Sequence, residues 1–165
     1  LAHDISLLAY HLPLDGHAEL GNNAQLAQRL GLTITGPLYP DNPKQVGNMA
    51  TLTPPMTVEA FSARLAQALG QTPLHIAGTQ EMISKVGFCS GAAQGFIDQA
   101  VVMGCDAYLS GEISEPTVHT AREAGIHYFA AGHHATERYG VQALGELLAQ
   151  QLGVRHQFVD IANPV

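Results

Sequence analysis

Short apolar runs alternate with stretches of helical spacing along most of this chain. Apolar runs bounded by turn residues predict strands, and apolar positions three or four apart predict helices. The expected strands cover residues 5–11, 32–38, 74–77, 85–89, 107–109, 126–131 and 154–161. Asn22 or Asn23 is expected to cap the first helix. Further helices are expected to begin at Thr57, near Phe96, at Ser114 and just after His133. This alternation predicts an α/β fold, a layered mixed sheet flanked by helices, in a single unit over residues 1–165.

Glycines and prolines set several of the expected boundaries. Gly31 and Gly70 each stand just past a predicted helix, where a glycine commonly ends the last turn. Residues 39–55 contain four prolines and are expected to form a loop. The last helix is expected to turn an apolar face toward the core, made of Val141, Leu144, Leu148 and Leu152.

Three glycine-containing segments directly follow predicted strands. They cover residues 89–95, 110–112 and 132–134. In α/β sheets ligands gather at the carboxyl ends of parallel strands. If the three strands are neighbours, all three turns open on one edge of the sheet, and we expect the functional residues there.

Charge and composition narrow the classes of partner. The formal net charge is −7 with only seven lysines and arginines, which argues against nucleic acid as a partner because its binding requires a basic face. No apolar run approaches the roughly 20 residues of a membrane span. The two cysteines, Cys89 and Cys105, lack the spacing of a metal motif. A reduced, cytoplasmic protein without a membrane partner is therefore expected.

The segment around His133 carries the clearest candidate chemistry. His133 and Glu137 are four residues apart, so on a helix they share a face and could begin a transition-metal site. The alternative is a solvated helix entry at which the macrodipole favours an acid. Gly132 and the apolar strand before it favour the metal interpretation. His134 is also at helical spacing from Glu137, and the residues alone do not choose between the two histidines.

Other candidates depend more on their surroundings. Asp15 follows an apolar run and is either a turn residue or a ligand whose partners lie elsewhere. Gly91 and Gly95 resemble a phosphate-binding turn before a helix, although a tight packing turn has the same pattern. Glu112 follows a predicted strand and could be a general base or a partner of a ligand; an acid at a helix entry is the alternative.

Four segments together resemble the Nif-three-like family, whose bacterial members are labelled GTP cyclohydrolase 1 type 2 homologues. The segments are HLPLD at 11–15, GNN at 21–23, SGE at 110–112 and GHHATER at 132–138. The resemblance implies two divalent metal ions per subunit in a toroidal homohexamer. It assigns Asp15, His133 and Glu137 as metal ligands, and places His11 nearby as a catalytic or supporting group.

The same resemblance implies a His-His pair of ligands upstream of Asp15, and the sequence contains none there. We therefore expect an N-terminal portion to be missing and the metal site to be incomplete. The implied function is a metal-dependent hydrolase acting on a nucleotide or phosphorylated small molecule, with zinc, manganese or iron. His11 or Glu112 would move the proton. The alternative is a non-catalytic metal-binding scaffold or regulatory protein that forms rings.

Overall fold

A computed structural model describes residues 2–42 and 44–163 of the chain. At its centre is a six-stranded sheet with the strand order β1-β2-β4-β5-β6-β3. Strands β4, β5 and β6 are parallel, whereas β1, β2 and β3 join the sheet in antiparallel pairs. The predicted α/β class with a mixed sheet is therefore confirmed. The strands are β1 Thr33–Pro37, β2 Asn48–Thr57, β3 Leu74–Ile76, β4 Met82–Phe88, β5 Ala107–Ser110 and β6 His127–Ala130.

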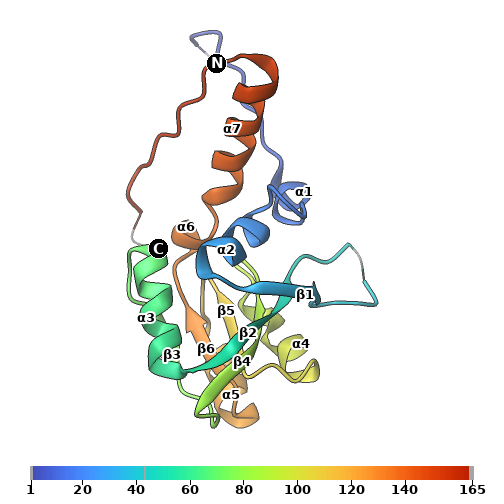
Figure 1. Cartoon of the computed structure of the whole chain (residues 1–165), viewed down its shortest axis with the longest axis vertical. Coiled ribbons are helices and arrows are strands. Elements are labelled where there is room, and N and C mark those ends of the chain that lie inside the picture. The colour runs from blue at the N-terminus through green and yellow to red at the C-terminus, as the bar shows by residue number, and fades with distance from the viewer. Residues whose placement is uncertain (1, 43, 164–165) are drawn as a thin grey trace.

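Helices cover both faces of the sheet (Figure 1). Helices α2 and α3 contribute to one apolar cluster with β4, and α4 and α5 contribute to a second with β5 and β6. The helical elements are α1 His11–Asp15, α2 Asn22–Leu30, α3 Val58–Leu69, the 3-10 turn η1 Gln94–Phe96, α4 Ile97–Val102, α5 Glu115–Ala124, α6 His133–Thr136 and α7 Tyr139–Leu152. Among the described residues, no helix is both long and apolar enough to cross a membrane.

Local signals placed α2 and α3 correctly. The Thr57 hydroxyl accepts a hydrogen bond of 3.2 Å from the Ala60 amide and begins α3. Gly31 and Gly70 end the two helices at φ of +62° and +77°, which a side chain would disfavour. These helix boundaries depend on residues that are close in sequence, so they can be predicted without the tertiary structure.

Residues 39–55 are a loop only in their first part. Residues 48–57 form β2, the longest strand of the described chain. Strand β2 accommodates Pro54 and Pro55 because its pairing with β4 shifts register between Thr51 and Met56. At this irregularity the missing proline amides interrupt no regular ladder hydrogen bond. Pro43, another of the four prolines, lies outside the described residues.

The expected strands at 5–11 and 154–161 are wrong. Residues 5–10 and 153–163 have no regular secondary structure, and His11 begins α1. Leu7 and Val159 are 86% and 66% exposed. Both segments run beside α7, which projects away from the sheet (Figure 1), so neither lies next to a strand that could pair with it.

The helix expected from just after His133 is divided in two, because α6 ends at Thr136 and α7 begins at Tyr139. The apolar face predicted for it lies on α7 but is not buried as predicted. Only Tyr139 and Gly140, in its first turn, are buried. Of its apolar face, Val141 and Leu152 are 50% and 68% exposed. The amphipathic spacing predicted that residues 141–152 are helical, but among the described residues no helical layer covers the apolar side of α7.

The prediction that Asn22 or Asn23 caps α2 is wrong. Gly21 occupies the cap position, and the helix has no side-chain cap. Both asparagines are buried and reach distant backbone amides instead. The Asn22 Oδ1 accepts from the Gly140 amide at 2.7 Å, and the Asn23 Oδ1 accepts from the Ser90 amide at 2.8 Å. Helix α2 thereby joins the start of α7 to the turn after β4.

Asn23→Ala should lower the free energy of unfolding by about 1–3 kcal/mol, because it leaves the buried Ser90 amide without its acceptor. Urea denaturation of the variant and the parent measures the difference. Gln28→Ala, at an exposed position of the same helix, is the control and should change stability by less than about 0.5 kcal/mol. Equal losses in both variants would contradict a specific role for the Asn23 bond.

Candidate metal centre

The three turns at the carboxyl ends of β4, β5 and β6 interlock through backbone hydrogen bonds. The Gly111 amide donates to the Gly91 carbonyl at 2.9 Å, and the Gly132 amide donates to the Gly111 carbonyl at 2.9 Å. The Gly91 amide donates to the Thr136 hydroxyl at 3.1 Å. The sequence-based expectation that these turns share one edge of the sheet is confirmed.

Two glycines allow these turns to approach closely. A Cβ on Gly91 would collide with the Glu137 carboxylate and lie 3.2 Å from the His133 Nε2, and its φ is +66°. A Cβ on Gly111 would lie 2.7 Å from the His133 Cα. Gly95 differs, since a Cβ there would meet nothing within 4 Å. Of the two predicted phosphate-binding glycines, only Gly91 thus lies against the candidate ligands; phosphate binding itself stays a prediction.

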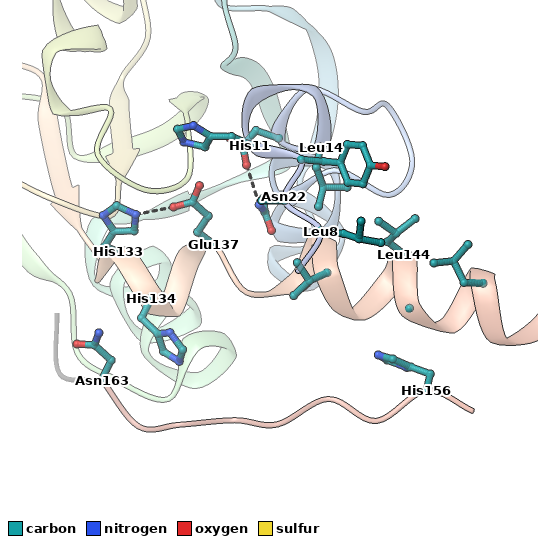
Figure 2. A pocket seen from close by; sticks show the side chains of 16 residues that line it. Leu8, His11, Leu14, Asn22, His133, His134, Glu137, Leu144, His156 and Asn163 are labelled. Carbon is teal, nitrogen blue, oxygen red and sulfur yellow. Dashed lines mark hydrogen bonds and ion pairs between the residues drawn. The ribbon is translucent and has the colours of Figure 1, made fainter. Parts of the chain in front are cut away.

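His11, Asp15 and Glu137 form a group that could hold a metal ion. Each offers one ligand atom, and these atoms all lie within 4.8 Å of one another. His11 and Asp15 belong to α1, and Glu137 follows the last residue of α6. Residues more than 120 positions apart in the sequence therefore converge on one point (Figure 2).

His133 lies beside this group, between two carboxylates. Its Nε2 is 2.6 Å from the Glu137 Oε2, and its Nδ1 is 2.7 Å from the Glu112 Oε1. A carboxylate on the second ring nitrogen is the usual support of a metal-binding histidine, because it fixes the tautomer and the ring orientation. The pKa of His133 is raised, chiefly by its hydrogen bond to Glu112. Partial burial lowers this pKa, whereas the charge of Glu137 raises it.

The carboxylate of Asp15 is buried, and it accepts a 2.7 Å hydrogen bond from the Asn22 amide group. Burial raises the pKa of Glu137, and the charge of Asp15 raises it further. Two acids held this close repel each other, and a divalent cation would relieve that repulsion. Imidazole nitrogens and carboxylate oxygens together suit zinc, manganese or iron. The donor set therefore fits a transition metal.

The role that the sequence predicted for Asn22 is wrong. It was expected to cap a helix, whereas its side chain joins Asp15 to the Gly140 amide. The only available signal was the GNN segment at 21–23, since nothing local distinguishes a capping asparagine from one that bonds a distant carboxylate.

His134, the rival of His133, points elsewhere. Its Nε2 is 3.2 Å from the Asp160 Oδ1, and Figure 2 shows the ring turned toward the C-terminal segment. Asp160 also accepts a 2.9 Å bond from Arg138. His134 and Arg138 thus hold the C-terminal segment against α6, while His133 faces Glu137.

Cys89 adjoins this region, and its burial disfavours the nucleophilic thiolate form. Burial raises the pKa of its thiol to about 12, and the nearby charges of Asp15 and Glu137 act in the same direction. Its sulfur accepts a 3.7 Å hydrogen bond from the Asn23 amide group. A neutral, buried thiol is a packing group.

Comparison with known proteins identifies close relatives of this chain. A family model described as Duf34/NIF3 (NGG1p interacting factor 3) matches residues 1–164. A Pseudomonas aeruginosa protein named GTP cyclohydrolase 1 type 2 homolog is 54% identical over 164 residues, which cover 99% of this chain and 65% of the relative. A protein of the same name from Escherichia coli is 46% identical over 165 residues. The chain therefore spans slightly less than two thirds of the length of these relatives.

Solved structures agree with these matches. A structural-genomics protein of unknown function, ybgI, superposes with a TM-score of 0.94 at 44% identity, covering 100% of this chain and 65% of that one. Reduced HcgD from Methanocaldococcus jannaschii superposes with a TM-score of 0.76 at 25% identity, covering 91% of this chain and 59% of that one.

Gly91→Ala should weaken binding of Mn²⁺ or Zn²⁺ by at least about tenfold, because the new methyl displaces Glu137 and His133 and strains a left-handed backbone. Gly95→Ala is the matched control, since it adds the same methyl in open space. Isothermal titration with each metal measures both variants. Unchanged affinity in Gly91→Ala, with the fold intact by circular dichroism, would remove these side chains from the binding site.

Glu112→Gln should lower metal affinity by roughly 10- to 100-fold without unfolding the chain, because it weakens the bond that orients His133. Glu123→Gln, an exposed acid on α5, should leave affinity unchanged. Competition with a fluorescent zinc chelator gives both values. If the two variants bind equally well, Glu112 does not act on the site through His133.

Proposed function

The chain belongs to the Duf34/NIF3 family, and from that premise we propose that it is a metal-dependent hydrolase acting on a nucleotide or another phosphorylated small molecule. The observation that supports this most directly is the approach of His11, Asp15 and Glu137 within 4.8 Å, with His133 bonded to Glu137. The relatives are named only as homologues of a GTP cyclohydrolase, and a fold does not fix a substrate.

We assign Asp15, His133 and Glu137 as ligands of zinc, manganese or iron, and the second ion that the family resemblance implies would need further ligands. When bound, such ions supply Lewis acidity toward a phosphoryl or carbonyl oxygen. Asp15 would present its carboxylate in a fixed orientation, because it is buried and bonded by Asn22.

The other residues at the site would orient the ligands, transfer protons or leave room for the substrate. Glu112 fixes the ring of His133 so that Nε2 faces Glu137. His11 is exposed and lies within the same group, so it can deliver a proton to a leaving group or complete the ligand set. Gly91 leaves room for the Glu137 carboxylate and offers the turn at which a phosphate could bind.

A second candidate is a non-catalytic, metal-binding scaffold that assembles into a ring. The exposed apolar side of α7 favours it, because such a surface commonly contacts another chain. The resemblance to the family supports a homohexamer and two ions per subunit. Since the chain spans 65% of the length of the Pseudomonas relative, these properties of the whole protein are proposals.

Glu137→Gln should lose most bound metal while remaining folded, because the substitution keeps the shape but removes a charge that attracts the cation. Metal analysis and thermal melts of the variant and the parent test this. Glu146→Gln, at an exposed position of α7, is the control. Equal metal content in all three proteins would reduce Glu137 to an acid at the end of a helix.

Hydrolysis separates the two candidate functions. With Mn²⁺ or Zn²⁺ the parent should turn over GTP or a phosphate ester such as p-nitrophenyl phosphate, and Glu137→Gln should lose that activity by about 10²-fold or more. Metal binding by the parent without turnover of either substrate would favour the scaffold.

A further inference from the structure

The peptide bond between Ala131 and Gly132 connects strand β6 to the turn that carries His133. Its amide hydrogen and its carbonyl oxygen are both bonded. The Gly132 amide donates to the Gly111 carbonyl at 2.9 Å. The Ala131 carbonyl accepts a hydrogen bond of 2.6 Å from the Nε2 of Gln71, which follows the glycine that ends α3. This peptide is therefore fixed from both sides, and one of the two bonds comes from a residue 60 positions away.

The register of the sheet explains why a side chain supplies this bond. Strand β3 pairs antiparallel with β6, and Leu74 is opposite Ala130. Extended by one residue, this register places Pro73 opposite Ala131. Proline has no amide hydrogen, so the backbone at this position offers Ala131 no donor. The side-chain amide of Gln71 supplies the donor instead, at the point where the pairing of β3 with β6 ends.

Gln71 also lies directly against the backbone of Gly132. The Gly132 φ is +92°, and a Cβ there would collide with the Gln71 Nε2. The Gly132 carbonyl accepts a hydrogen bond of 3.1 Å from the Thr136 amide, and this bond begins α6. The orientation of the Ala131–Gly132 peptide therefore sets the direction in which α6 leaves the sheet.

Helix α6 is too short to fix its own direction. It has four residues, begins with His133 and ends directly before Glu137. A single turn of helix has little stability of its own, so its placement depends on the contacts at its ends. A rotation of the preceding peptide would move both side chains away from Asp15 and from the Glu112 carboxylate that is bonded to His133.

We propose that Gln71 is a positioning residue of the metal centre. Its bond to the Ala131 carbonyl holds the turn in the orientation at which His133 and Glu137 meet Asp15. Gln71 acts through the backbone and not as a ligand. This inference rests on the proposed function, and it adds to that site a residue outside the four segments that carry the family resemblance.

Gln71→Met tests the proposal, because it removes the donor and keeps the length of the side chain. Gln71 is half-buried, so the variant should fold. Its affinity for Mn²⁺ or Zn²⁺ should fall by roughly tenfold or more, measured by isothermal titration. Gln25→Met is the matched control, since Gln25 is also half-buried and its Nε2 donates to the Glu19 carbonyl at 2.8 Å. The control should bind metal as the parent does.

Two further measurements separate positioning from a general loss of stability. The visible absorption of the Co²⁺-loaded protein reports ligand geometry, and at saturating Co²⁺ it should change in Gln71→Met but not in Gln25→Met. In the metal-free protein, the Gly132 and Thr136 amides should exchange hydrogen at least about fivefold faster in Gln71→Met than in the parent, whereas the amides of β5 should keep their rates.

Failure of this inference is distinguishable from failure of the proposed function. If the parent binds no divalent metal, the proposed function is overturned and this inference with it. If the parent binds metal and Gln71→Met has the same affinity and the same Co²⁺ spectrum, the metal centre stands and the role of Gln71 is overturned. Equal losses of affinity in Gln71→Met and Gln25→Met, or faster exchange throughout the sheet, would reduce Gln71 to a contributor to general stability and would also overturn it.

Discussion

Two carboxylates held close together, on Asp15 and Glu137, are the constraint on which the rest of this structure depends. Like charges with ligand atoms within 4.8 Å of each other are unfavourable in a half-buried site, so the fold must position them against their own repulsion. Asn22 holds Asp15 from one side, and His133 holds Glu137 from the other. Neither contact neutralises the pair completely, and the arrangement therefore favours a cation.

Backbone geometry provides much of the precision of this site. The turns after β4, β5 and β6 are bonded amide to carbonyl, which fixes their separation independently of any side chain. Gly91 and Gly111 lack the atoms that would otherwise push Glu137 and His133 away. His133 and Glu137 consequently lie at the rigid edge of a sheet, whereas His11 and Asp15 approach from α1. Thr136 bonds the turn after β4 to the short helix that bears His133.

The sequence predicted those parts of the fold that depend on local signals. Helix α3, with its Thr57 cap and Gly70 end, and the parallel strands that end in glycine turns were both found. The segments at 5–11 and 154–161 were not, because an apolar run becomes a strand only where a neighbour can pair with it. In the site, the four-residue spacing of His133 and Glu137 correctly predicted that their side chains lie together. The role of Asn22 and the choice between His133 and His134 depended on Asp15, Glu112 and Asp160, which lie at least 7 positions from the residues they bind.

The projecting helix α7 divides the molecule into regions of unequal thermodynamic stability. Only its first turn is buried, and Glu137 precedes that turn. Segments with few buried contacts open locally at a small fraction of the free energy needed for global unfolding. The outer turns of α7 can therefore fray in a native molecule whose sheet stays protected from hydrogen exchange. In such a partly open state Asp15 keeps its bond from Asn22 and Glu137 keeps its contact with His133, so the candidate ligands would stay in place at temperatures where the outer turns of α7 already exchange their amide hydrogens.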